Sequence, residues 1–262
     1  MVSVFELSKW YADCISDKGD AVILYHAELR IGMFPIHYES LLLKEHDSPV
    51  RAMYSLHGQP APIAKDGCIE WQSQNWRTRA IWHDLSGAHQ EVLYESDSGG
   101  LRWHCVAPRS VASVQIGSDQ SFEGWGYAEH LKLTIPPWRL PIHRLRWGRF
   151  VNATDALVWI DWSGPYAKRI AYLNGSPAPA ESITDQEVVL DGATALHLED
   201  FRVIREGPLG ETALAVFPKL GDLFPESLLN VRECKWISRA LLRRLGRPDS
   251  IGTAIHEVVE WL

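Results

Sequence analysis

The sequence predicts an all-β protein made of two consecutive antiparallel β domains of the barrel type, with little helix. Three observations predict this fold class. Apolar and polar residues alternate with a period of two along much of the 262-residue chain, as they do in strands with one buried face. Turn sequences separate the alternating segments at intervals of about 8–12 residues, which is typical of barrels and sandwiches. The chain also contains 12 tryptophans, whose wide flat side chains fill barrel interiors and line apolar cavities.

The alternation places the strands in order along the chain. It is clearest at 21–29, 50–58, 100–106, 124–133, 145–150, 156–165, 194–207 and 252–262. In the first of these segments Ala21, Ile23 and Tyr25 share one face, whereas His26 and Glu28 take the other. Segments 8–16 and 233–245 fit either a strand or a helix. Turn signals lie between the runs, at 17–20, 57–62, 65–67, 97–100, 173–179 and 191–192.

Helical signal is confined to FPESLLNV, residues 224–231, where a proline precedes Glu226 and Ser227 at a possible helix start. The polar segment GSDQS, residues 117–121, is the best candidate for a domain boundary. The sequence therefore predicts an N-terminal β domain over 1–118 and a C-terminal β domain over 119–262. A short echo between LYHAEL at 24–29 and GYAEHL at 126–131 would fit two related β units.

Composition excludes several classes of function. The net charge of −7 argues against nucleic acid as a partner, because nucleic-acid binding requires a basic surface. No apolar run approaches the ~18 residues that span a bilayer, and the first residues do not form a signal peptide. The four cysteines form no CxxC motif, so reduced thiols and a cytoplasmic location are expected. Nucleotide-binding and HExxH motifs are missing, so neither a cofactor nor a metal is expected.

Glu129 is the first candidate for chemistry. In GWGYAEHLKL, residues 124–133, strand geometry places it on one face with Trp125 and Tyr127, while His130 points to the other face. If the aromatic face is interior, Glu129 is a buried acid whose pKa burial would raise unless a cation paired with it. Such a carboxyl can donate a proton to an alkene or a carbonyl. An ion pair with an arginine, such as Arg146 or Arg149, is the structural alternative.

Asp161 is the second candidate. In ALVWIDWSGP, residues 156–165, Leu157, Trp159 and Asp161 share a face, and both faces of this strand are largely apolar. An aspartate there is costly unless it is paired or hydrogen-bonded. It is interpreted either as a second acid beside Trp159 or as an acceptor of turn hydrogen bonds near Ser163.

Between these segments, 136–150 contains three prolines, which favour an extended, covered connection before a strand at 145–150. Leu145, Trp147 and Arg149 share one face of that strand. Arg149 could pair with Glu129 or Asp161, or bind an anionic group of a substrate.

At GWGYAEHL and LVWIDW, and also in the opening KWYADCISDKGDAVILYHAEL, the chain resembles the lipocalin-like (calycin) superfamily of carotenoid 1,2-hydratase (hydroxyneurosporene synthase) and AttH-like proteins. The resemblance implies two consecutive lipocalin-like antiparallel β-barrel domains with an apolar cavity. The hydratase motifs align with Glu129 and His130 and with Trp159 and Asp161. This chain has Glu129 where the hydratases tend to carry an aspartate, and Lys132 where they tend to carry a tryptophan.

The resemblance implies a hydrophobic small molecule as the partner, and hydration or cyclisation of an unsaturated, isoprenoid-like substrate without a cofactor. The expected catalytic residues are Asp161, Glu129 and His130, and the expected substrate-binding residues are Trp125, Tyr127, Trp147, Arg149 and Trp159. An enzyme of the lyase or the cyclase/isomerase type is one hypothesis, and a non-catalytic carrier of a hydrophobic ligand is the alternative. A scaffold with a solid core is the third. The oligomeric state stays open.

Overall fold

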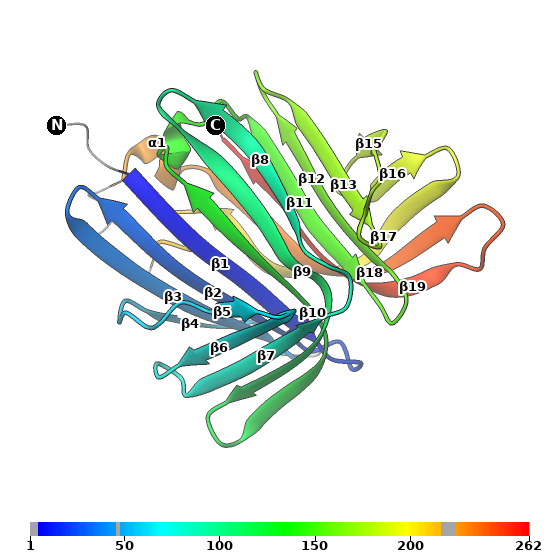
Figure 1. Ribbon diagram of the computed structural model, residues 1–262, viewed down its shortest axis with the longest axis horizontal. Coiled ribbons are helices and arrows are strands. Elements are labelled where there is room, and N and C mark those ends of the chain that lie inside the picture. The colour runs from blue at the N-terminus through cyan, green and yellow to red at the C-terminus, as the bar shows by residue number, and fades with distance from the viewer. Residues whose placement is uncertain (1–4, 46–47, 216–223, 262) are drawn as a thin grey trace. The chain divides into compact units, whose positions relative to one another are not determined.

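The computed structural model describes residues 5–45, 48–215 and 224–261, and these residues form strands joined by turns and loops, with very little helix (Figure 1). Every strand pairing among them is antiparallel. Helix is limited to η1 (Pro137–Arg139) and α1 (Glu226–Leu229) in the part of the chain that is described. The predicted all-β fold with one short helix within 224–231 is therefore confirmed. Leu262, the last residue of the expected strand 252–262, lies outside the described residues.

The chain divides into two compact units, Met1–Pro136 and Pro137–Leu262. The first unit contains β1 (Phe5–Ile15), β2 (Ala21–Ile31), β3 (Phe34–Lys44), β4 (Arg51–Ser55), β5 (Ile63–Lys65), β6 (Cys68–Ser73), β7 (Thr78–Asp84), β8 (His89–Ser96), β9 (Gly99–Ile116) and β10 (Gln120–Leu133). Its sheet has the order β4-β3-β2-β1-β10-β9-β7-β6-β5, and β8 also pairs with β9.

The first sheet curls, because strands far apart in its order meet in one core. Side chains from β3 and from β6 pack together there, although six positions of the strand order separate those strands. The hydroxyl of Ser73 on β6 also donates a hydrogen bond of 2.7 Å to Glu39 on β3. The buried core residues are Trp10, Ala12, Cys14, Val22, Leu24, Leu41, Leu43, Ile69, Trp71, Ala80, Trp82, Val106, Ala107, Ala112, Val114, Ile116, Phe122 and Ala128.

The second unit contains β11 (Arg144–Val151), β12 (Ala156–Ser163), β13 (Lys168–Leu173), β14 (Ser176–Pro177), β15 (Ser182–Ile183), β16 (Glu187–Asp191), β17 (Thr194–Pro208), β18 (Arg232–Arg244) and β19 (Ser250–Glu260). Its sheet has the order β14-β13-β12-β11-β19-β18-β17-β16-β15. The core residues are Phe150, Leu157, Trp159, Ala171, Ile183, Val188, Leu190, Leu196, Leu198, Ala240, Leu242 and Ala254.

The division between the units follows β10, whereas the sequence placed the boundary before it, at 118/119. The reason is strand pairing: β10 pairs with β1 along Leu7–Ile15 and with β9 along most of its length, so it closes the first sheet. The polar segment at 117–121 contains the tight turn between β9 and β10, at 117–119, in which Gly117 has a φ of 62°.

The two units share one strand order, with β1 equivalent to β11 and β10 equivalent to β19. This equivalence aligns GYAEH at 126–130 with GTAIH at 252–256. His130 and His256 thus take the same place, and each imidazole Nε2 lies 2.8 Å from a serine hydroxyl, of Ser8 and Ser238 respectively. The echo predicted from the sequence is different, since residues 24–29 and 126–131 both lie in the first unit.

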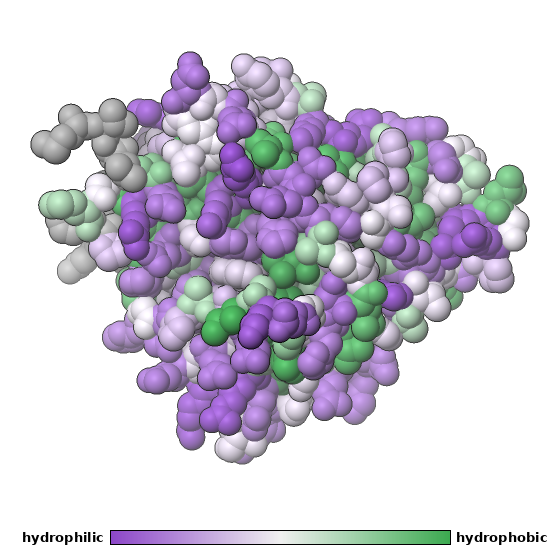
Figure 2. Space-filling model, viewed as in Figure 1, coloured by the Kyte–Doolittle hydropathy of each residue, from purple (hydrophilic) through white to green (hydrophobic). Residues whose placement is uncertain are grey.

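The face of the molecule shown in Figure 2 is mostly polar, with apolar side chains scattered across it. Among the described residues, Met33 and Leu245 are the most exposed large apolar side chains, at 92% and 85%. No helix within the described ranges has the length and apolar character to cross a membrane.

Candidate active site

Glu129 projects from β10 on the face of the first sheet that lies opposite the core, and it is 9% exposed. Its Oε2 accepts a hydrogen bond of 2.5 Å from Trp103 Nε1 and one of 2.7 Å from the Tyr127 hydroxyl. Trp103 comes from β9, whose Cys105 is the register partner of Glu129. Because Oε2 already accepts two hydrogen bonds, a proton on this carboxyl is expected to reside on Oε1.

Tyr127 and Cys105 lie beside Glu129 and are both fully buried. Burial, followed by the charges of Cys105 and Glu129, raises the pKa of Tyr127 well above its usual value near 10. Burial likewise raises the pKa of the Cys105 thiol well above 9, although a hydrogen bond with Tyr127 opposes this shift. Both groups therefore keep their protons at neutral pH, so Tyr127 acts as a hydrogen-bond donor and Cys105 is a poor nucleophile.

Like Trp103, three further residues of this face were not among the site residues predicted from the sequence: Tyr11, Asp13 and Tyr25. Asp13 is 1% exposed and accepts a hydrogen bond of 2.9 Å from the Tyr11 hydroxyl. The Tyr11 ring also makes edge contacts with Tyr25 at 5.3 Å and with Tyr127 at 6.0 Å between centroids. These tyrosines and Trp103 surround the two acids, and we call this group the tyrosine face (Tyr11, Asp13, Tyr25, Trp103, Tyr127 and Glu129). The Lys9 ammonium, from the same face of β1, lies 5.3 Å from the centroid of the Tyr25 ring.

His130 lies on the opposite face of β10, as strand geometry predicted. Its ring stacks on Trp10, with centroids 4.6 Å apart. Burial, followed by nearby Lys132, His104 and His26, lowers the pKa of His130 to about 4. Its imidazole is therefore neutral at neutral pH, and it does not form a dyad with Glu129. Trp125, by contrast, projects from the same face as Tyr127 and is half-buried.

Asp161 and Trp159 project together from β12, as the sequence predicted, but Asp161 is ion-paired. Its Oδ1 lies 3.1 Å from Arg169 Nε and its Oδ2 lies 3.9 Å from Arg146 Nη1. Arg146 also pairs with Asp185, at 2.6 Å. Both carboxylate oxygens of Asp161 are therefore engaged by arginine side chains. Trp159 is 2% exposed and belongs to the core of the second unit.

Trp147 and Arg149 lie on the opposite face of the second sheet from Asp161, because Gly148 and Arg146 are the register partners of Trp159 and Asp161. The Lys235 ammonium lies 5.3 Å from the centroid of the Trp147 ring. Arg149 is fully buried, and its Nη1 donates a hydrogen bond of 3.3 Å to the carbonyl oxygen of Thr253.

The predicted site residues thus fall into separate groups. Trp125, Tyr127 and Glu129 share one face of the first sheet, and His130 lies on its other face. The other four belong to the second unit, where Trp159 and Asp161 lie on one face of the sheet and Trp147 and Arg149 lie on the opposite face. Over the described ranges, no group of three or more His, Cys, Asp or Glu side chains is arranged to hold a metal ion.

No protein-family model matches the sequence, and no curated protein matches it at a significant level. Solved structures do match. CghA aligns with a TM-score of 0.58 at 11% identity, over 98% of this chain and 88% of CghA. Kievitone hydratase from Nectria haematococca aligns with a TM-score of 0.57 at 10% identity, over 99% and 89% of the two chains.

A putative AttH from Nitrosomonas europaea aligns with a TM-score of 0.55 at 10% identity, over 99% of this chain and 93% of the AttH chain. Matches of this length show that the chain has the two-domain lipocalin-like fold of these proteins. The fold that the sequence resemblance implied is therefore confirmed.

Proposed function

We propose that the chain is a cofactor-independent enzyme that hydrates or cyclises a lipophilic, unsaturated small molecule of the isoprenoid or polyene type. The observation that carries this proposal is the buried Glu129 carboxyl, which Trp103 and Tyr127 hold through Oε2. The carboxyl is thereby oriented, and Oε1 is the oxygen from which a proton would be donated. Oriented carboxyls in apolar surroundings are suited to general acid catalysis.

The reaction begins when Glu129 transfers a proton to one carbon of an alkene, which leaves a carbocation on the other carbon. The faces of Tyr11 and Trp103 stabilise that cation by cation–π attraction. In hydration, water adds to the cation and gives up one proton to a base, so that the alkene and water form an alcohol. In cyclisation, a second alkene of the same molecule adds to the cation, and loss of a proton gives an isomer.

The comparisons support the reaction class but not a substrate. One protein with this fold is named as a kievitone hydratase, and the proposed chemistry agrees with that name. Among the three expected catalytic residues, the proposal assigns proton donation to Glu129 rather than to Asp161, because both oxygens of Asp161 are engaged in ion pairs with Arg169 and Arg146. His130 projects to the other face and takes no part in this transfer.

The test is incubation of the purified chain with a panel of polyenes and prenylated phenols in water enriched in oxygen-18. Mass spectrometry distinguishes a hydrated product, which carries the heavy oxygen, from a cyclised isomer of unchanged mass. Glu129→Gln is expected to lower turnover by about 100-fold or more, since general acid catalysis contributes roughly 10²–10⁴-fold. Glu123→Gln, the same change at an exposed position of β10, is expected to keep wild-type turnover. A folded Glu129→Gln variant of full activity would remove the proposed acid.

A carrier of a hydrophobic ligand is the second candidate, and one observation favours it. That hypothesis expected the acids to be paired with arginines, and Asp161 is paired with Arg146 and Arg169. The same panel separates the two functions: binding without product on long incubation selects the carrier, and product formation selects the enzyme.

A further inference from the structure

We infer that Asp13 is a second catalytic carboxyl, which shares a proton with Glu129 and acts as the base when Glu129 acts as the acid. This inference rests on the proposed function and deepens it. Hydration needs both a proton donor and an acceptor for the proton that the attacking water releases. The tyrosine face places a second buried acid, Asp13, on the strand next to that of Glu129.

The two acids occur in the same tripeptide pattern. Tyr11-Ala12-Asp13 on β1 and Tyr127-Ala128-Glu129 on β10 both read Tyr-Ala-acid. The antiparallel register pairs Ala12 with Ala128 and therefore pairs Tyr11 with Glu129, and Asp13 with Tyr127. The two tripeptides are thus related by a local two-fold axis through the alanine pair. Within each tripeptide, the tyrosine hydroxyl donates to the acid of its own strand, at 2.9 Å and 2.7 Å.

Core packing does not require acids at these positions. Ala12 and Ala128 point into the core of the first unit and are fully buried, whereas the tyrosines and acids point the other way. Burying two carboxyls on adjacent strands is costly, because both must be desolvated. Apolar residues would fill the same places without that cost, which agrees with a role for the two acids in addition to packing.

The geometry suits a donor and an acceptor on either side of one reacting bond. Asp13 and Glu129 are diagonal neighbours across the β1–β10 ladder. The Cα atoms of such neighbours lie roughly 7–8 Å apart. Two carboxyls at diagonal positions of one sheet face can approach a common small molecule from different sides, as an acid and a base acting on one reaction require. The Tyr11 and Tyr127 rings contact each other across the other diagonal of the same four positions.

The two carboxyl groups together neither gain nor lose a proton over one turnover. Glu129 in its acid form gives its proton to the alkene, and the carboxylate of Asp13 takes one proton from water as its oxygen bonds to the cation. The pair starts and ends with one proton, which moves from Glu129 to Asp13 in each turnover. Return of the proton to Glu129 resets the site, and in the reverse dehydration the two residues exchange roles.

The first part of the test needs no substrate. Infrared spectroscopy follows the carbonyl stretch of protonated carboxylic acids as the pH is changed, in the wild-type chain, Asp13→Asn, Glu129→Gln and the control Asp17→Asn, at an exposed turn position. Removing either acid is expected to lower the titration midpoint of the other by about one pH unit or more, because repulsion between like charges disappears. Midpoints of Asp13 and Glu129 that do not respond to each other would overturn the inference.

The second part uses the hydrated product from the labelled-water assay, with folding of each variant checked by circular dichroism. Asp13→Asn is expected to lower turnover by about 100-fold and to remove the acidic limb of the pH profile of kcat/KM, which an ionised base produces. Asp13→Glu is expected to restore part of the activity and the limb. If Asp13→Asn keeps both turnover and the limb while Glu129→Gln is inactive, the inference fails and the proposed function stands. If the wild-type chain forms no product, the proposed function fails, and the infrared midpoints still decide whether the proton is shared.

Discussion

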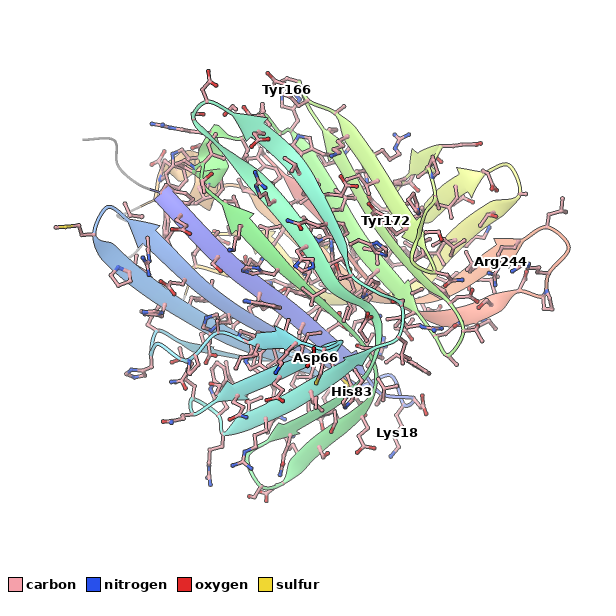
Figure 3. All side chains as sticks on the ribbon, viewed as in Figure 1. Lys18, Asp66, His83, Tyr166, Tyr172 and Arg244 are labelled. Atoms are coloured by element: carbon pink, nitrogen blue, oxygen red, sulfur yellow. The ribbon has the colours of Figure 1, made fainter. Side chains whose placement is uncertain are left out.

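Asp155→Ala is expected to lower the free energy of unfolding by about 3–5 kcal/mol, the usual cost of removing one partner from a buried ion pair. Asp155 is 3% exposed, and its two carboxylate oxygens each lie 2.9 Å from a terminal nitrogen of Arg244. Arg244, labelled in Figure 3, is the last residue of β18. The carboxylate also accepts hydrogen bonds from Asn174 at 2.8 Å and Ser250 at 2.7 Å. It therefore links its own loop to three other segments of the second unit, and its loss leaves the partly buried Arg244 without this partner.

The same network gives the stability of the second unit an acid dependence. Burial alone would raise the pKa of Asp155, but hydrogen bonds from Asn174, Ser250, Arg244 and Thr154 together outweigh burial and lower the pKa to about 2. A carboxyl whose pKa is lower in the folded chain stabilises it above its unfolded pKa near 4, and this contribution is lost as the pH falls toward 2. The loss is on the order of 2 kcal/mol, at about 1.4 kcal/mol for each pKa unit.

Urea denaturation at pH 7, 4 and 2.5 measures both the stability lost when the Asp155 carboxylate is removed and the stability lost in acid. Asp155→Asn is expected to be less stable at pH 7 and to lose less stability than the wild-type chain between pH 4 and 2.5. Asp249→Asn is the matched control, because Asp249 pairs at 3.5 Å with Arg243 and both side chains are about half exposed. An exposed pair of this kind contributes roughly 0–1 kcal/mol. If Asp155→Asn and Asp249→Asn lose equal amounts of unfolding free energy at pH 7, the Asp155 network does not stabilise the second unit.

The fold was predictable because strand alternation is a local property. Residues 233–245 fitted either a helix or a strand, and all but the last of them lie in β18, because both neighbouring strands supply a hydrogen-bonding edge. The domain boundary was not predictable in the same way. A turn sequence such as 117–121 is equally compatible with a turn between two strands of a hairpin and with a boundary between two domains. Only the pairing of β10 with β1 shows that it is a hairpin turn.

The faces of the candidate residues were predictable, but their partners were not. Glu129 was expected among Trp125 and Tyr127, and it lies there. Its hydrogen bond from Trp103 depends on the register of β9 against β10, which includes an irregularity next to Ala128 and Glu129. Asp13 was missed although the signal was present, since the Tyr-Ala-acid tripeptide occurs at 11–13 as well as at 127–129. The residue pattern of one strand does not show which strand lies beside it. The repeat therefore could not show that the two acids are neighbours until the strand pairing was known.

Gly148→Ala is expected to destabilise the second unit by about 3 kcal/mol, at the upper end of the range for overpacked cores. Gly148 is the register partner of Trp159 across β11 and β12. A methyl group at position 148 would overlap Cζ2 and Cε2 of the Trp159 indole and lie 2.8 Å from the Cβ of His256. The indole cannot move aside easily, because Trp159 is 2% exposed and packed in the core. Chemical denaturation of the single variant measures this cost.

A double-mutant cycle tests the cause of that effect. Trp159→Phe removes the part of the indole that the new methyl group would strike, at the cost of a smaller core side chain. In the Trp159→Phe background, Gly148→Ala is therefore expected to cost less than about 1 kcal/mol, so the two changes should couple by roughly 2 kcal/mol. Gly192→Ala is the control, because no heavy atom lies within 4 Å of a Cβ built at Gly192. Additive effects of the Gly148 and Trp159 variants would mean that the indole does not set the requirement for glycine, and backbone strain or His256 would have to explain it.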